Sequence, residues 1–107
     1  MTKVALKLLP GARSDIKAAL AYFSEFNPEL GERFANAVGE TYEQLAAMPG
    51  IGRPKQLRYN HCPGLRIWRV DEFPEYLIVY QETETEVLIS RVLHSARNID
   101  RILNDDE

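Results

Sequence analysis

Five consecutive apolar residues, Tyr76 to Tyr80, constrain the fold of this chain more than any other stretch. Most of them are β-branched or aromatic, which favours a strand, and they are apolar on both faces. A strand of this kind lies centrally in a sheet whose two faces are both covered. We therefore expect helices against one face, and against the other either the C-terminal segment from Ala96 to Leu103 or another protein.

Strand-like runs flank this stretch, from Leu65 to Val70 and from Val87 to Leu93. Short polar segments separate the three runs, which predicts an antiparallel meander. A fourth run, Lys3 to Leu9, alternates apolar and other residues and stops at Pro10-Gly11, so it too is expected to be a strand.

Two amphipathic helices are predicted on either side of Asn27-Pro28. Ser14 is the expected N-cap of the first, which ends near Phe26. Asn27 is the expected N-cap of the second, with Pro28 at its first position, where a missing N–H costs nothing, and Pro49-Gly50 ends it. The short corner predicts an antiparallel helical hairpin. The stripes at helical spacing that are expected to face the core are Ile16, Ala19, Leu20 and Phe23 in the first helix, and Leu30, Phe34, Ala37, Val38, Thr41, Leu45 and Met48 in the second.

The order of these elements, β-α-α-β-β-β, defines an α+β fold with a helical hairpin on an antiparallel sheet and a short C-terminal helix. A chain of 107 residues is long enough for one core, so one domain over residues 1–107 is expected. No apolar run approaches the ~20 residues that cross a bilayer. The single cysteine, Cys62, forms no internal disulfide and fits a reducing cytoplasm.

Charge and motifs exclude several kinds of function. The net charge of −3 speaks against coating nucleic acid by charge alone. Cys62-Pro63-Gly64 predicts a turn, which favours a structural thiol at Cys62, next to His61, over a nucleophile. No phosphate loop, metal-ligand spacing or paired carboxylates predict a cofactor or metal. Residues 53–70 form a basic segment, because they include no Asp or Glu and five cationic residues: Arg53, Lys55, Arg58, Arg66 and Arg69. This segment is either a binding face or a solvated loop and strand.

Five short stretches along nearly the whole chain have a characteristic order and spacing. They are Asn27-Pro28 with Arg33-Phe34, Leu45 through Met48-Pro49 to Gly52-Arg53, Gly64-Leu65-Arg66, Tyr76 to Tyr80, and Arg91-Val92-Leu93-His94-Ser95-Ala96-Arg97-Asn98. Together they resemble the ParE toxins of the ParE/RelE superfamily. The last stretch is typical of the ParE branch, where Gly is more frequent at Ser95 and Asp at Asn98.

This resemblance implies a growth-arresting toxin of a bacterial type II toxin–antitoxin pair, held in a hetero-oligomer by a ParD-like antitoxin whose flexible C-terminal segment wraps it. In the ParE branch the toxin inhibits DNA gyrase and needs no chemistry of its own. Arg91, His94 and Arg97 are then expected to bind the target or to anchor the C-terminal segment. The preferred prediction is therefore a gyrase inhibitor in the cytoplasm.

The RelE branch offers an alternative, a ribosome-dependent mRNA interferase that cleaves message in the A site. Its chemistry needs an acid, a base and cations on the reacting phosphate. The candidates are Arg58, Arg66, Arg91 and His94, which converge if Arg66 and Arg91 lie on neighbouring strands. Those two arginines can equally pair with Glu84 or Glu86. A second alternative is an interaction module that has lost its toxicity.

Overall fold

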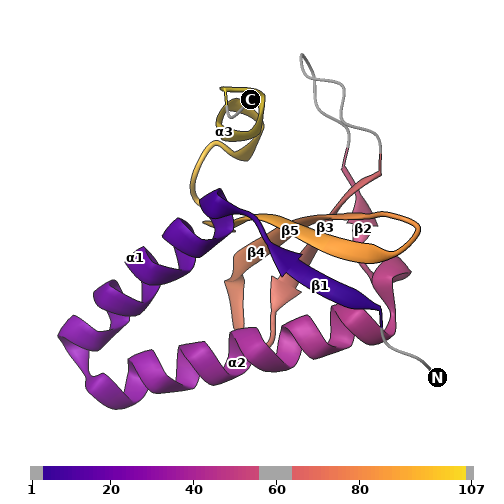
Figure 1. Ribbon diagram of the computed structural model, residues 1–107. Coiled ribbons are helices and arrows are strands. Elements are labelled where there is room, and N and C mark those ends of the chain that lie inside the picture. The colour runs from indigo at the N-terminus through magenta and orange to yellow at the C-terminus, as the bar shows by residue number, and fades with distance from the viewer. Residues whose placement is uncertain (1–3, 56–63, 106–107) are drawn as a thin grey trace.

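The structure is a computed structural model that describes residues 4–55 and 64–105. Figure 1 shows a helical hairpin on one side of a sheet and a short C-terminal helix on the other. The α+β class predicted from the sequence is confirmed. Arg58, His61 and Cys62 lie outside the described residues. The elements are β1 (Ala5–Leu8), α1 (Pro10–Phe26), α2 (Pro28–Ala47), η1 (Pro49–Ile51), β2 (Arg53–Pro54), β3 (Leu65–Val70), β4 (Phe73–Glu82), β5 (Glu86–His94) and α3 (Ile99–Asp105).

The sheet has the strand order β1-β5-β4-β3-β2. Strands β3, β4 and β5 form the predicted antiparallel meander. Strand β1 runs parallel to β5, from Ala5 opposite Glu86 to Leu8 opposite Ile89, so the sheet is mixed and not wholly antiparallel as expected. Parallel neighbours need a long crossover, and the hairpin with the meander supplies it. The two-residue strand β2 pairs with β3 and was not predicted.

Helix α1 begins four residues before the predicted cap, because Pro10 opens it. Leu9 is the N-cap, in extended conformation, and Ser14 lies inside the helix. Proline suits the first helical position because its φ is already helical and its absent N–H has no partner to lose. From the sequence, Pro10 was predicted only to end a strand. Between α1 and α2, the predicted N-cap at Asn27 is confirmed, because the Asn27 side chain accepts a hydrogen bond from the Glu29 N–H at 2.9 Å.

The hairpin buries its apolar stripe against one face of the sheet. Phe34 and Leu45 of α2 and Tyr80 of β4 are fully buried. Thr41, the buried polar residue of the stripe, donates to the Ala37 carbonyl and accepts from the Asp71 N–H, which joins α2 to the β3–β4 turn. Met48 was expected in the stripe but is 55% exposed, because α2 has already ended there.

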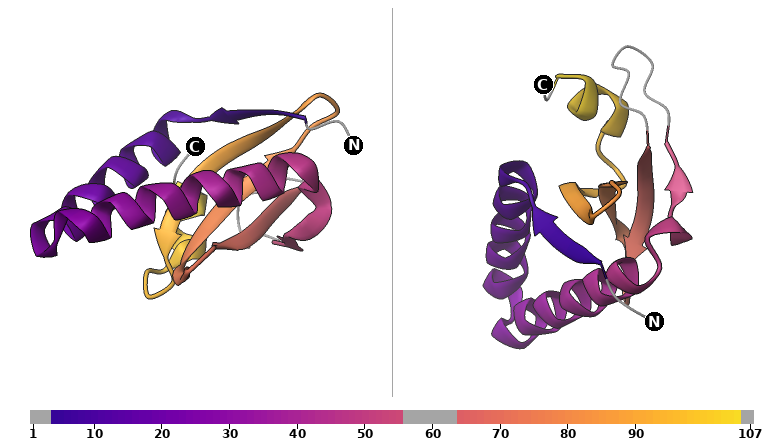
Figure 2. Two further views of the ribbon diagram at one scale, coloured as in Figure 1. Left: turned by 90° about the horizontal axis from the view of Figure 1, so that it is seen from below. Right: turned by 45° about the vertical axis from the view of Figure 1, so that its right-hand side comes forward.

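Helix α3 covers the opposite face of the sheet (Figure 2). Its apolar positions follow helical spacing, and a salt bridge of 2.5 Å between Lys55 Nζ and Asp100 Oδ1 ties the helix to the end of β2. The chain itself, and not another protein, thus covers this part of the sheet. The second core contains Leu65, Val79, Leu93 and Leu103, with Ile67, Ile99 and Ile102 packed against it. Among the described residues, no helix is both long and apolar enough to cross a membrane.

Candidate functional site

A β-bulge interrupts β5 where it faces α1. Val79 of β4 pairs with Arg91, but the next residue, Tyr80, pairs with Ile89, so Ser90 is the extra residue. A bulge bends the strand and redirects the neighbouring side chains. It also leaves a backbone N–H outside the regular ladder, and the site is built around that irregularity.

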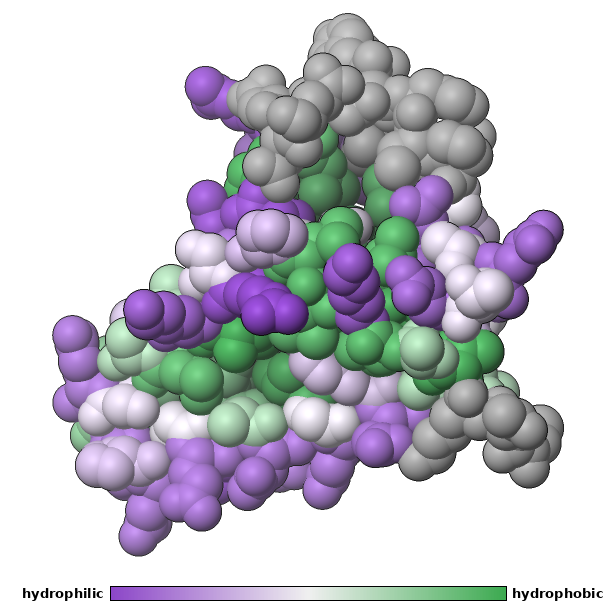
Figure 3. All heavy atoms as spheres, in the orientation of Figure 1, coloured by the Kyte–Doolittle hydropathy of each residue, from purple (hydrophilic) through white to green (hydrophobic). Residues whose placement is uncertain are grey.

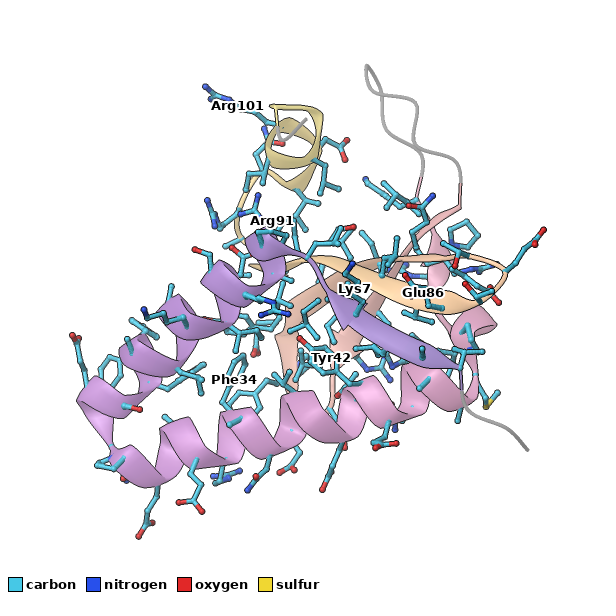
Figure 4. The ribbon with its side chains drawn as sticks, viewed as in Figure 1. Lys7, Phe34, Tyr42, Glu86, Arg91 and Arg101 are labelled. Atoms are coloured by element: carbon cyan, nitrogen blue, oxygen red, sulfur yellow. The ribbon has the colours of Figure 1, made fainter. Side chains whose placement is uncertain are left out.

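Arg91, labelled in Figure 4, lies next to the bulge and forms a salt bridge with Asp15 of α1. Its Nε donates to Asp15 Oδ2 at 2.7 Å and its Nη2 to Oδ1 at 2.9 Å. The Val92 N–H donates to the same Oδ2 at 2.9 Å. The two side chains are only 10% and 14% exposed for Asp15 and Arg91, respectively. This bidentate pair therefore fastens α1 to the sheet.

Gly11 makes the close approach possible. A Cβ at this position would lie 2.8 Å from Arg91 Cδ and 3.2 Å from the Ser90 carbonyl oxygen. The first turn of α1 thus rests directly on the Arg91 side chain. Asp15 was not predicted from the sequence because neither spacing nor periodicity connects a helix residue with a strand residue 76 positions away.

Arg66 lies on the far side of β4 from Arg91, so the two arginines are not on neighbouring strands as the interferase hypothesis required. Arg66 Nη1 donates to the carbonyl oxygens of Gly52 at 2.8 Å and Gly50 at 3.4 Å. Its cross-strand neighbour Tyr80 donates to the Pro49 carbonyl at 2.6 Å and accepts from the Gly52 N–H at 2.9 Å. Burial raises the pKa of Tyr80. Both residues hold the turn that follows α2.

His94 and Arg97 lie in the connection from β5 to α3. His94 Nδ1 accepts from the Ala96 N–H at 3.0 Å, so the proton of the neutral ring is on Nε2. The Arg97 N–H donates to the His94 carbonyl at 3.0 Å, which closes the turn, and Arg97 is exposed. The His94 ring meets Tyr76 edge-on, with centroids 5.2 Å apart.

Two adjoining pockets lie beside α1, and both are lined by Tyr22, Tyr76 and His94. No role was predicted for Tyr22 from the sequence, although Tyr22 and Phe26 are aromatic residues four apart and outside the predicted stripe. Both are largely exposed. One pocket, of about 190 Å³, is lined by Asp15, Ala18, Ala19, Tyr22, Tyr76, Val92, His94 and Arg97. The other, of about 360 Å³, is lined by Tyr22, Phe23, Phe73, Glu75, Tyr76 and His94.

The basic segment contributes less free charge than the sequence suggested. Lys55 and Arg66 bind groups within the chain, as described above. Arg69 lies over the ring of Trp68, 5.3 Å from its centroid, and Arg53 is exposed. Trp68 is a half-buried strand residue, and its Nε1 donates to Gln44 Oε1 of α2 at 3.4 Å.

Within residues 4–55 and 64–105, one group of carboxylates has the spacing of metal ligands. Oxygen atoms of Glu40, Asp71 and Glu72 lie within 4.8 Å of one another, and all three residues are exposed. Glu72 also pairs with Arg33, with Nη2 and Oε1 3.6 Å apart. Exposed acidic groups of this kind are common without an ion, so the geometry assigns no metal to them.

Comparison with known proteins defines first the fold and then the family. A chain in a solved structure of the chromosomal ParDE toxin–antitoxin system from P. aeruginosa has the same fold, with a TM-score of 0.70 at 21% identity. The match covers 86% of this chain and 96% of the other. The family model for the ParE toxin of type II toxin–antitoxin systems, parDE, matches residues 6–99, so the chain belongs to the ParE toxin family. No curated protein matches the chain.

Proposed function

We propose that this ParE-family toxin acts by inhibiting DNA gyrase and that a ParD-like antitoxin neutralises it. The observation that supports a binding mechanism most directly is the ion pair between Arg91 and Asp15. An arginine held in this way is a positioning residue for the pocket of about 190 Å³ between α1 and β5, the α1–β5 groove. His94 and Arg97, which line that groove, are the target-binding residues in this proposal.

The alternative, cleavage of messenger RNA, needs an acid, a base and cations around one phosphate. Arg66 and Arg91 are separated by β4, and each binds groups of the fold. Gathering them at one phosphate would require breaking those contacts. The sequence pI of about 5.4 also disfavours docking on ribosomal RNA, because such docking draws on clustered cations.

A groove beside the edge strand β1 supports the antitoxin part of the proposal. It has a volume of about 380 Å³ and lies between β1 and α2. Figure 3 shows hydrophobic surface in the angle between the two helices and β1. An apolar surface of this kind suits an amphipathic segment of a partner. The residues that line the groove are Val4, Leu6, Gly39, Tyr42, Glu43 and Ala46.

The mechanism is tested with purified toxin in two assays. Toxin should inhibit gyrase-catalysed supercoiling, and equimolar antitoxin should restore it, while message on translating ribosomes stays intact. Cleavage fragments that map to A-site codons would contradict the proposal. Normal growth of cells that express the folded toxin without antitoxin would favour the inactive interaction module.

The antitoxin surface is tested with Gly39→Leu. A Cβ at Gly39 meets no atom within 4 Å, so the variant should fold, and its side chain should partly fill the groove. Binding of the antitoxin should weaken roughly ten-fold, the effect of about 1.4 kcal/mol. Ala35→Leu, at an exposed α2 position outside the groove, is the control. Equal affinities of the two variants would argue against this surface.

A further inference from the structure

The larger pocket beside α1 is walled by aromatic rings. The Phe23 ring is one of its walls and contacts three others, with ring centroids 5.5 Å from Tyr22, 5.4 Å from Phe73 and 5.6 Å from Tyr76. The rings come from α1 and from the start of β4, so the fold itself holds them in place. The pocket of about 360 Å³ has room for one large side chain.

The mouth of this pocket is open and carries a carboxylate. Tyr22 is 53% exposed, and Phe26, which meets Tyr22 edge-on at 5.1 Å, is 70% exposed. Glu75 on the rim is exposed, and its side chain forms no ion pair within residues 4–55 and 64–105. Aromatic surface left uncovered beside an available carboxylate is a feature of binding sites.

The electrostatics of the pocket favour a cation. Aromatic faces carry negative potential, and they attract ammonium and guanidinium groups. Burial raises the pKa of Tyr76, and the neighbouring Tyr22 and Glu75 raise it further, so a negative charge is disfavoured there. The described residues that line the pocket include no Lys or Arg.

From this combination of rings and carboxylate, we propose that the pocket receives an arginine side chain of a partner protein. A planar guanidinium can stack on a ring face while two of its N–H groups reach the Glu75 carboxylate. An ammonium group makes neither arrangement as well, because it is compact and strongly hydrated. The inference goes beyond gyrase inhibition and does not depend on it.

The test uses the intact toxin and small probes, followed by NMR. N-acetyl-arginine amide should shift the side-chain resonances of Tyr22, Tyr76 and His94 in a saturable way. N-acetyl-citrulline amide has nearly the same shape without the charge, so it should bind at least about ten-fold more weakly. Raising the salt concentration should weaken the arginine probe selectively. Equal binding of the two probes would overturn the proposal.

Two matched variants test whether the Glu75 carboxylate binds the guanidinium group of the probe. Glu75→Gln should weaken the arginine probe roughly five-fold or more and leave the citrulline probe unchanged. Glu82→Gln, at an exposed position near the other end of β4, should bind both probes as the wild type does. Arginine binding that is unchanged in Glu75→Gln would also overturn the proposal. Because no gyrase is present, the result is independent of the toxin's mechanism.

Discussion

Asp15 and Arg91, 76 positions apart in the chain, form a bidentate ion pair that joins α1 to the bulge of β5. The same carboxylate accepts the Val92 N–H, a backbone donor next to the bulge. Buried backbone donors need partners, so one side chain satisfies both the irregular strand and the arginine. The position of α1, and with it the groove that holds His94 and Arg97, depends on this carboxylate.

Replacing Asp15 by Asn should destabilise the protein by about 3 kcal/mol. The substitution removes the charge but keeps the size, and it leaves the guanidinium of Arg91 without its counter-charge at a site that is mostly buried. Urea unfolding followed by circular dichroism measures the change. Glu32→Gln, at an exposed position of α2, serves as the control for loss of a carboxylate. Equal stability of the two variants would show that the pair contributes little.

Two glycine-to-alanine substitutions should change stability in opposite directions. At Gly52 a Cβ would lie 2.6 Å from Tyr80 Oη and 3.0 Å from the Ile67 carbonyl oxygen, and the backbone there is ordinary extended chain. Gly52→Ala should therefore cost about 1–3 kcal/mol through crowding alone. Gly39, in the middle of α2, has open space, so Gly39→Ala should stabilise by about 0.5–1 kcal/mol. Thermal unfolding of both variants checks the signs.

The sequence predicted what depends on local periodicity. The helical stripe of Phe34 and Leu45, the cap at Asn27 and the central strand around Ile78 are each encoded within a few residues. The apolar spacing of Ile99 and Leu103 likewise made α3 a candidate cover for the second face of the sheet.

The site was less predictable because its contacts are long-range. The parallel placement of β1, which joins the meander beside β5, follows from the three-dimensional path of the chain and not from any local pattern. Nothing near Arg91 or Arg66 in the sequence indicates Asp15 or the carbonyl oxygens of Gly50 and Gly52 as partners. Polar side chains take partners that the fold brings to them, so their roles emerge only with the tertiary structure.

Tyr42 should make stability fall at high pH. Burial, with a contribution from the charge of Asp15, raises the pKa of Tyr42 to about 12. The pKa in the unfolded chain is near 10, so the unfolded state loses its proton first as the pH rises. Unfolding is then favoured, and the wild type should lose up to about 2 kcal/mol between pH 10 and 12. Urea unfolding at several pH values measures this loss.

Tyr42→Phe provides the matched variant. The Tyr42 hydroxyl is buried without a hydrogen-bond partner in the part of the chain that the structure describes. Its removal should stabilise the protein by about 1 kcal/mol at pH 7 and make the decline above pH 10 shallower. Some decline should remain, because the pKa values of Tyr76 and Tyr80 are raised as well. An unchanged pH profile would show that another group causes the decline.

Arg97→Glu should reduce gyrase inhibition without unfolding the toxin. Arg97 is exposed and lines the groove beside His94, and the hydrogen bond from its backbone N–H to the His94 carbonyl is retained when the side chain changes. Reversal of a charge at a protein interface should raise the half-inhibitory toxin concentration about ten-fold or more. The free energy of unfolding should change by less than about 0.5 kcal/mol, as is usual for an exposed position. Arg53→Glu, on the exposed strand β2, introduces the same charge change away from the groove. If Arg53→Glu abolishes inhibition while Arg97→Glu retains it, the target binds the β2 side of the molecule and not the α1–β5 groove.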